Sequence, residues 1–558
     1  MPDFSTLAEA VAGIGDLYPD NGFTFQDHGG RETTYSFPEI AAATARRAGA
    51  LDGLGLARGD RVALIATDPE QFVLTFLAAI RIGAVPVPIY PPMYLAKLDG
   101  YLRQTGAILT SSEAKLVVVS ARLRDSLSGL AARAAPGVRI VDVEGLATGV
   151  ESGFSPPDGA VSPDDLAFLQ YTSGSTAEPR GVRVTHRCLI SNVRAFVGAG
   201  LAADARVDKG VTWLPLYHDM GLIGFVLAPV YWGISIVFIP TLRFVRNANV
   251  WMDTIHAHRG TISFAPNFAF ELALRKARAG GAEPWDLSCV RALGCGAEPI
   301  QPDTIRTFSR VFGERWRLPP NSVVPAYGLA ESTLAATMKP LGAPDRVRRI
   351  DRSIFEEQGR AIETADPDTE VLEHVSCGVP FPQHEVAIMD PAGRKLPDGA
   401  EGEICLRGPS VGAGYVGVRG GWGSAMRDGW LRTGDLGYLD AGELYVTGRM
   451  KDLIILNGRN VHPQVIEWLA SDVEGVRSGC VAAFSRPGRT GEELVVVAET
   501  RGDRAAAISK IEVAVVSGLF VKPADVVCVK PGSLPRTSSG KLRRHQIRKS
   551  YLSGSLSQ

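Results

Sequence analysis

The stretch YTSGSTAEPRGV, residues 171–182, combines hydroxyl side chains, two glycines and an arginine directly after the apolar run LAFLQ. Gly174 and Gly181 allow the backbone to turn so that its N–H groups point inward. Such a concave set of donors suits phosphate oxygens, although solvated surface loops have the same composition. The stretch lacks the G-x-x-x-x-G-K-[ST] pattern of a Walker A loop. The expected phosphate-binding residues are Thr172, Ser173, Gly174, Ser175, Thr176 and Arg180.

Short apolar strands alternate with helices through the first part of the chain. The stretch 36–51 begins with a capping box, Ser36 and Glu39, and carries a proline in its first turn. Continuous apolar strands between helices are typical of parallel sheets covered on both faces. We therefore predict an α/β protein whose large N-terminal domain contains two parallel-type sheets. The expected strands include 60–66, 115–120, 139–143, 166–172 and 261–265.

Two changes of pattern divide the rest of the chain. From Val379 onward, short strands separated by Gly, Pro and Asp turns predict a β-rich subdomain. After residue 450 the α/β alternation returns over the length of a small independent domain. We predict an N-terminal domain over residues 1–450 and a small, mobile C-terminal α/β domain over residues 451–558.

The overall charge and the cysteines exclude several classes of protein. With 59 basic and 60 acidic residues the net charge is −1, so no overall field favours binding to nucleic acid. The seven cysteines are dispersed, which argues for a reducing compartment and against a zinc site. Residues 221–240 are long enough to span a bilayer, but Pro229 and Gly233 interrupt them, so we predict a buried helix, a turn and a strand. With no signal-peptide pattern, we expect a cytoplasmic protein without stable membrane insertion.

Further motifs follow the loop in a fixed order: WLPLYHDMGLIG (213–224), GCGAEPI (294–300), AYGLAEST (326–333), WLRTGDLGYL (430–439), VTGRMKDLII (446–455) and LPRTSSGKLRR (534–544). Together with the loop they resemble the ordered motif set of the adenylate-forming superfamily, which includes acyl-CoA synthetases, peptide-synthetase adenylation domains and luciferases. The resemblance extends over essentially the whole chain. It implies an enzyme that uses ATP and Mg²⁺ to convert a carboxylate into an acyl-AMP, with release of pyrophosphate.

The resemblance also implies roles for residues at matching motif positions. The loop would hold the β- and γ-phosphates, and Glu331 and Thr176 would hold Mg²⁺. The GCGAEP backbone would lie along the adenine, on which Tyr327 would stack. Asp435 would accept hydrogen bonds from the ribose hydroxyls, and Arg449 would reach the ribose or the phosphates. The implied nucleotide-binding set also contains Gly296, Ala297, Glu298 and Gly328.

The resemblance implies that Lys541 and His218 act in catalysis together with Glu331, and that Lys451 is a hinge. Lys541 resembles the family's mobile lysine, which bridges the carboxylate and the α-phosphate. Lys451 stands at the hinge about which the C-terminal domain rotates in relatives, and His218 resembles a gate between the acyl and nucleotide sites. The loop departs from the family pattern at Ala177, which replaces a glycine, and at Arg180, which replaces a lysine but keeps its charge. The basic residues around Lys541 form either a docking patch for an acidic carrier protein or a solvated helix face: Arg543, Arg544, Arg548 and Lys549.

The stretch 334–375 is longer than its counterpart in acyl-CoA synthetases and resembles the insertion of fatty acyl-AMP ligases. In that group the insertion restrains the C-terminal domain, and the acyl group passes to the phosphopantetheine thiol of an acyl carrier protein. No D-S-L motif follows Lys541, so we expect a carrier protein or carrier domain acting in trans. GRNVHPQ (458–464) departs slightly from the family's GRNHYPQ. A fatty acyl-CoA synthetase, a non-catalytic acyl- or adenylate-binding protein and an amino-acid-activating domain remain alternatives.

The implied substrate is a medium- or long-chain fatty acid. In an apolar tunnel each buried methylene would contribute roughly 0.8 kcal/mol, although ordinary core residues show the same apolar pattern. GPSVG (408–412) matches the nucleophile elbow of hydrolases, but no helix is expected after it and no Asp/His pair is evident, so we reject a hydrolase. The expected tunnel residues are Trp213, Tyr217, Ile223 and Phe225.

Overall fold

The computed structural model describes residues 2–92, 98–130, 138–148, 160–172, 179–278, 284–417, 421–456, 459–488, 491–519, 521–537 and 540–556. Its largest element is a nine-stranded sheet in the order β17-β14-β13-β12-β11-β9-β10-β1-β2. The pairs from β1 through β10, β9, β11 and β12 to β13 are parallel, and the outer pairs are antiparallel. The strands are β1 (Gly22–Gln26), β2 (Glu32–Ser36), β9 (Lys209–Thr212), β10 (Ser235–Phe238), β11 (Ile262–Ala265), β12 (Ala292–Cys295), β13 (Val323–Gly328), β14 (Ala335–Met338) and β17 (Val379–Pro380).

A second, four-stranded sheet is entirely parallel, in the order β4-β3-β5-β6. Its strands are β3 (Arg61–Ile65), β4 (Val85–Pro88), β5 (Ala114–Val119) and β6 (Arg139–Asp142). The expected capping box is present: Ser36 and Glu39 bond reciprocally at the start of α2 (Phe37–Gly53). The α/β architecture with parallel sheets is therefore confirmed. Other helices of this part are α1 (Leu7–Leu17), α3 (Pro69–Arg81), α4 (Leu98–Ser112), α8 (His186–Val193), α12 (Asn249–His258), α13 (Asn267–Arg278) and α14 (Pro302–Trp316).

The strand at residues 166–172 pairs in a different direction from the one expected. β7 (Leu166–Thr172) pairs antiparallel with β8 (Arg180–Thr185), and β8 pairs antiparallel with β20 (Tyr415–Val416). The expectation that 166–172 belongs to a parallel sheet was therefore wrong. An apolar run has the same composition in either kind of sheet, so its sequence does not reveal its direction.

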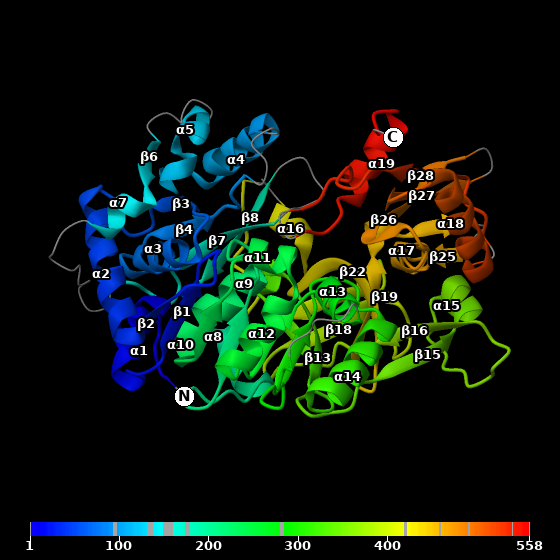
Figure 1. Ribbon diagram of the computed structural model, residues 1–558, viewed down its shortest axis with the longest axis horizontal. Helices are drawn as coiled ribbons and strands as arrows, with labels where there is room; N and C mark the ends of the chain where they lie inside the picture. Colours follow the sequence, from blue (N-terminus) through cyan, green and yellow to red (C-terminus); the bar gives the residue numbers. More distant parts are fainter. Residues whose placement is uncertain are drawn as a thin grey trace.

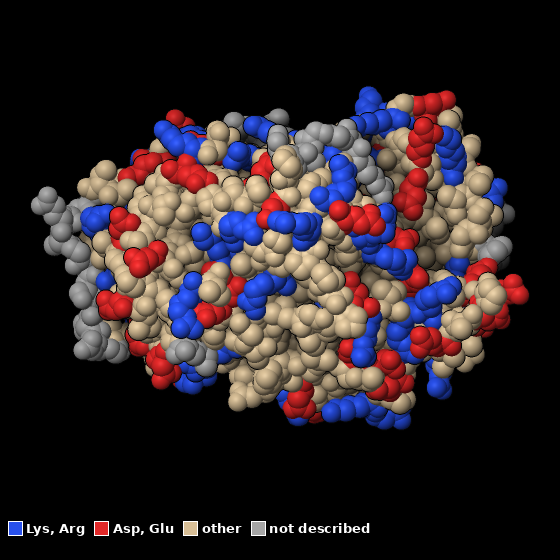
Figure 2. Space-filling view, turned by 60° about the horizontal axis from the view of Figure 1, so that its bottom comes forward, with Lys and Arg blue, Asp and Glu red and all other residues tan. Residues whose placement is uncertain are grey.

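The uncharged segment 221–240 folds as predicted. Helical turns α9 (Asp219–Leu222), the π-helix η4 (Ile223–Leu227) and α10 (Ala228–Trp232) end at Gly233, whose φ of 85° closes the helix before β10. Within the described residues, no helix combines the length and the apolar character that a membrane span requires. Basic and acidic side chains are interspersed across the face seen in Figure 2.

The predicted β-rich region is an antiparallel sheet, β18-β19-β22-β21, with β23 paired to β22. It consists of β18 (Glu385–Met389), β19 (Gly402–Arg407), β21 (Met426–Arg427), β22 (Trp430–Asp440) and β23 (Glu443–Arg449). Before it, the stretch 334–375 contains β14 of the large sheet, then a hairpin of β15 (Val347–Asp351) and β16 (Val371–Val375) around α15 (Arg352–Gln358). Figure 1 shows α15 next to β25 (Arg459–Val461) and α18 (Arg504–Leu519).

Residues 451–558, here called the tail region, have their own apolar core around a sheet of β26, β27 and β28. The division of the chain at residue 450 stays a prediction. The elements are β24 (Ile454–Leu456), β25 (Arg459–Val461), α17 (Pro463–Ser471), β26 (Val476–Pro487), β27 (Glu492–Thr500), α18 (Arg504–Leu519), β28 (Asp525–Val529) and α19 (Arg544–Leu552). Two of the basic residues considered for docking are engaged inside this region, since Arg544 pairs with Asp452 and Glu467 and Arg548 donates to the Ser485 carbonyl.

Candidate active site

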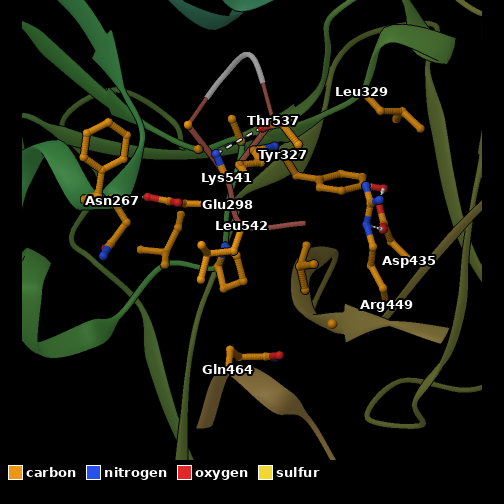
Figure 3. A pocket seen from close by; sticks show the side chains of 18 of the residues that line it. Asn267, Glu298, Tyr327, Leu329, Asp435, Arg449, Gln464, Thr537, Lys541 and Leu542 are labelled. Atoms are coloured by element: carbon orange, nitrogen blue, oxygen red, sulfur yellow. Dashed lines mark hydrogen bonds and ion pairs between the residues drawn. The ribbon is translucent and has the colours of Figure 1, made fainter. Parts of the chain in front are cut away.

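One large cavity, with a volume of about 2650 Å³, collects most of the predicted site residues. Its walls come from the carboxyl ends of β11, β12 and β13, from the β22–β23 pair and from the tail region. Ligands bind at the carboxyl ends of strands in open α/β sheets. Figure 3 shows side chains from these separate parts of the chain facing one another across the cavity.

A buried carboxylate stands on one wall of the cavity. Asp435 on β22 lies opposite Arg449 on β23, and its Oδ1 is 2.9 Å from Arg449 Nε. Its Oδ2 accepts a 2.8 Å hydrogen bond from the Tyr327 hydroxyl (Figure 3). Burial, and then the Asp435 charge, raises the pKa of Tyr327 well above its usual value, so its hydroxyl remains a donor. The Asp435 carboxylate is therefore held between the Tyr327 hydroxyl and the Arg449 guanidinium.

Lys541 enters the cavity from the tail region on a tight turn. Gly540 has a φ of 89°, and the Lys541 N–H donates to Thr537 Oγ1 at 3.1 Å while its carbonyl accepts from Thr537 N–H at 2.7 Å. Burial and the Arg449 charge lower the pKa of Lys541, although the nearby carboxylates of Asp219 and Glu298 raise it. The Lys541 ammonium group therefore lies near both the Arg449 guanidinium and the carboxylates of Asp219 and Glu298.

The segment 294–300 follows β12 and reaches the cavity with a constrained backbone. A β-carbon at Gly296 would lie 2.7 Å from the Ala326 carbonyl oxygen, and Ala297 has a left-handed φ of 67°. Glu298 accepts a 2.7 Å hydrogen bond from the Phe268 N–H at the start of α13. Burial raises the pKa of Glu298 to about 7, against the lowering effect of that hydrogen bond and of Lys541. Gly328 also lines the cavity, and a β-carbon there would overlap the Leu334 carbonyl.

Two further polar pairs line the cavity. His218 Nδ1 is 2.5 Å from Asp219 Oδ1 at the start of α9. Burial raises the pKa of Asp219, but His218 and Lys541 lower it by more, so the carboxylate stays ionised. Glu331 Oε1 accepts a 2.7 Å hydrogen bond from the Tyr415 hydroxyl, and the Arg180 guanidinium lies 5.8 Å from the Tyr415 ring centroid.

The opposite end of the cavity is apolar and runs between the large sheet and two π-helices, η3 (Arg194–Gly200) and η4. Of the expected tunnel residues, Tyr217 and Phe225 line the cavity. Trp213 and Ile223 are not among its lining residues: Trp213 stacks on Phe244 at 3.7 Å and Ile223 is fully buried. The further apolar lining consists of Phe196, Val197, Leu201, Pro229, Ile234, Ile236, Ile262, Phe264 and Met338.

The loop of the stretch 171–182, between β7 and β8, is described only at its two ends. Ser173, Gly174, Ser175 and Thr176 lie outside the described residues. Its flanking residues Thr172 and Arg180 line the cavity, and so does Lys451. The structure therefore brings both ends of the loop to the same cavity as Asp435, Arg449 and Lys541.

Sequence reasoning missed several partners. Tyr415 bonds Glu331, but its motif AGYVG gave no signal beyond ruling out a helix. Asp219 stands in the YHDMG motif, and nothing in that motif indicated its contact with His218. Ser410 of GPSVG does have a histidine partner, His384, with Nε2 2.6 Å from its Oγ, but Ser410 is fully buried and so cannot act on a solvent-borne substrate.

Comparisons with known proteins agree with this geometry. The model of the family described as AMP-binding enzyme matches residues 16–416. Long-chain-fatty-acid--AMP ligase FadD32 of Mycolicibacterium smegmatis is 34% identical over 89% of this chain and 86% of its own. Medium-chain-fatty-acid--[acyl-carrier-protein] ligase JamA of Moorena producens is 32% identical over 90% and 87%. A solved structure from a study of fatty acyl-adenylate ligases from E. coli and L. pneumophila superposes with a TM-score of 0.91 and 35% identity, covering 99% of this chain and 98% of that one.

Proposed function

Because this chain belongs to the AMP-binding enzyme family, we propose that it is a fatty acyl-AMP ligase that passes its acyl group to the phosphopantetheine thiol of an acyl carrier protein. The relatives named as fatty-acid–AMP and fatty-acid–carrier-protein ligases cover nearly the whole chain and support both parts of this proposal. The observation that carries it is a single cavity with an apolar arm at one end and Lys541, Asp435 and Arg449 at the other.

In this proposal the polar end of the cavity holds the nucleotide. Asp435 accepts hydrogen bonds from the ribose hydroxyls, with Arg449 and Tyr327 fixing its carboxylate. Gly296, Ala297, Glu298 and Gly328 form the adenine wall, and the absence of β-carbons at the two glycines lets this backbone pack closely against the Ala326 and Leu334 carbonyls behind it. The loop ending at Arg180 holds the β- and γ-phosphates.

The first half-reaction joins the fatty acid to AMP. A carboxylate oxygen of the fatty acid forms a bond to the α-phosphorus of ATP, and the bond from that phosphorus to the bridging oxygen of pyrophosphate breaks. Lys541 lies between the substrate carboxylate and the α-phosphate and neutralises the charge that grows there; one such electrostatic contact typically contributes about 10²–10³ in rate. His218 separates the acyl arm from the nucleotide end.

Mg²⁺ fits the donors that the chain offers. This ion keeps several waters and binds through one or two carboxylates together with substrate phosphates. Glu331 supplies one carboxylate at the cavity wall, held by Tyr415, and Thr176 of the loop is the proposed second ligand. Bound there, the ion would screen the charge of the departing pyrophosphate.

The second half-reaction transfers the acyl group. The thiolate of the phosphopantetheine arm attacks the acyl carbonyl carbon, a thioester forms and AMP leaves. For the thiol to reach this carbon, the tail region rotates about Lys451 and withdraws Lys541 from the cavity, so a mobile domain serves two reactions at one site.

The test uses the purified protein with ATP, Mg²⁺ and dodecanoic acid. One sample receives CoA and another a phosphopantetheinylated carrier protein, and products are identified by mass spectrometry. We expect acyl-AMP that persists beside CoA and is consumed by the carrier protein. Efficient formation of dodecanoyl-CoA would instead make the protein a fatty acyl-CoA synthetase, and absence of acyl-AMP with fatty acids of every chain length would overturn the proposal.

A further inference from the structure

The segment GRNVHPQ departs from the family's GRNHYPQ at Val461 and His462, and the histidine has an unusual environment. His462 precedes α17 but makes no capping hydrogen bond there. Its ring instead leaves the tail region, and its side chain is only 4% exposed. His462 Nε2 lies 2.9 Å from Oε1 of Glu401, a residue of the large N-terminal part whose side chain is 7% exposed.

Three residues surround the His462 ring and are here called the socket: Glu401, Thr447 and Gly448. Glu401 Oε1 also accepts a hydrogen bond from the Thr447 hydroxyl, and the Glu401 N–H donates to the Gly359 carbonyl at 2.8 Å. A β-carbon at Gly448 would overlap the His462 ring, so only a glycine allows this approach. The Phe355 ring of α15 lies 6.3 Å away and closes another side.

In the described part of the chain, the carboxylate within hydrogen-bonding distance of the His462 ring is that of Glu401. His374, which packs on Phe355 at 5.1 Å, bonds the Tyr438 hydroxyl through Nδ1 at 3.2 Å. Burial and then the neighbouring His462 lower the pKa of His374 to about 4, so it is neutral near neutral pH. His462 Nδ1 is buried and has no hydrogen-bond partner within the described part of the chain. The contact with Glu401 is therefore the principal polar bond of this ring.

The socket and His462 lie on opposite sides of the predicted hinge in the chain. Thr447 and Gly448 immediately precede Arg449 on β23, before Lys451, whereas His462 follows Lys451. The neighbouring Gln464 side chain also donates to the Thr447 carbonyl. A rotation of the tail region at Lys451 would separate the two sides, withdraw the ring and leave Glu401 buried with fewer donors, which costs free energy.

We propose that His462 is a positioning residue that plugs into the Glu401–Thr447–Gly448 socket and holds the tail region where Lys541 reaches the cavity. The plug favours the first half-reaction and must be withdrawn for the second. This inference rests on the proposed function for its kinetic consequence, but the position of the tail region can be measured without any substrate.

The first arm of the test measures that position directly. Ala365 and Ala506 are exposed, one in the N-terminal part and one on α18, and spin labels on cysteines introduced at these two positions report the distance between the two parts. We expect a single narrow distance distribution in the otherwise unchanged protein and a broader one in His462→Ala. His462→Gln, whose amide can donate to Glu401, should restore the narrow distribution. An unchanged distribution in His462→Ala would overturn the proposal.

The second arm separates the half-reactions. In His462→Ala we expect ATP–pyrophosphate exchange to fall by about tenfold, while transfer from preformed acyl-AMP to the carrier protein is unchanged or faster, with partial rescue of exchange in His462→Gln. An equal loss of both half-reactions would indicate a merely structural role and overturn the proposal. The control is His28→Ala, at an exposed histidine near the start of the chain. Absence of exchange in the unmutated protein would count against the proposed function alone, because the distance measurement still tests whether His462 holds the tail region in place.

Discussion

The carboxylate of Asp435 lies 2.9 Å from Arg449 Nε across the β22–β23 pair, and Asp435 is only 6% exposed. The two residues are direct cross-strand partners, so the short contact follows from the sheet register. Arg449 is followed within the same segment by the predicted hinge at Lys451. The proposed acceptor for the ribose is thus held by a cross-strand ion pair on one side of the predicted hinge, and Lys541 lies on the other side in the chain.

Asp435→Asn tests the nucleotide end of the cavity. The amide keeps the shape of the side chain but loses the charge that pairs with Arg449 and one acceptor for the ribose hydroxyls. Hydrogen bonds to charged groups contribute about 1.5–3 kcal/mol, so we expect the KM for ATP to rise by roughly 10–100-fold. ATP–pyrophosphate exchange at varied ATP measures this. The control is Asp428→Asn at an exposed turn of the same sheet, and an unchanged KM in Asp435→Asn would contradict the ribose assignment.

Lys541→Ala separates the two half-reactions. Loss of the ammonium group should lower ATP–pyrophosphate exchange by roughly 10²–10³. Transfer from chemically prepared acyl-AMP to a carrier protein should continue, because the proposed rotation withdraws Lys541 in that step. Lys522→Ala removes an exposed lysine of the same region and serves as the control. Equal loss of exchange and transfer would mean that Lys541 does not act specifically in adenylation.

Local signals in the sequence predicted local structure well. The capping box of Ser36 and Glu39 marked the start of α2 because its hydrogen bonds join residues three apart. Pro229 and Gly233 marked the break in the apolar segment because each restricts or frees the backbone at its own position. Ordered motifs placed Asp435, Arg449 and Lys541 in one cavity, although they come from different parts of the chain.

Relationships between distant segments were not predictable in the same way. The direction of β7 depends on which strand pairs with it, and its apolar composition is compatible with either direction. Trp213 was expected at the acyl tunnel because it is apolar, but stacking on Phe244 places it in the core instead. The contact of His462 with Glu401 joins residues 61 positions apart, and neither residue type alone indicates the other.

Gly224→Leu tests the apolar arm. Gly224 lines the cavity, and a β-carbon there would meet only Leu334 Cδ2 at 3.8 Å, so a larger side chain would project into open space. The leucine would occupy room needed by several methylenes, each contributing roughly 0.8 kcal/mol. We expect kcat/KM for hexadecanoate to fall by at least about tenfold, with little change for octanoate.

The control for this change is Gly100→Leu, at an exposed position of α4 with no atom within 4 Å of the added β-carbon. Acyl-AMP formation from a series of fatty acids, measured by mass spectrometry, gives the chain-length profile. A uniform loss across all chain lengths, or no loss at all, would show that the fatty acid does not pass Gly224.

His186 gives the protein a pH-dependent stability. Its ring is 1% exposed, and Nδ1 accepts a 3.1 Å hydrogen bond from the Leu7 N–H, which requires that nitrogen to be unprotonated. Burial lowers the pKa of His186 to about 4, with Asp165 opposing the shift, from about 6.5 in the unfolded chain. Because the unfolded chain binds the proton more readily, this stabilisation is complete above about pH 6.5 and is lost as the pH falls toward 4.

Between about pH 7.5 and 5, His186 should lower the free energy of unfolding by about 2 kcal/mol. His186→Gln keeps an acceptor for the Leu7 N–H but does not titrate, so its free energy of unfolding should decrease by about that much less over the same interval. His374, whose pKa burial also lowers to about 4, contributes equally to both proteins, so the difference between them isolates His186. Urea unfolding at the two pH values measures this difference, with exposed His28→Gln as the control. The same pH dependence in His186→Gln and the unmutated protein would mean that His186 is not buried as a neutral ring.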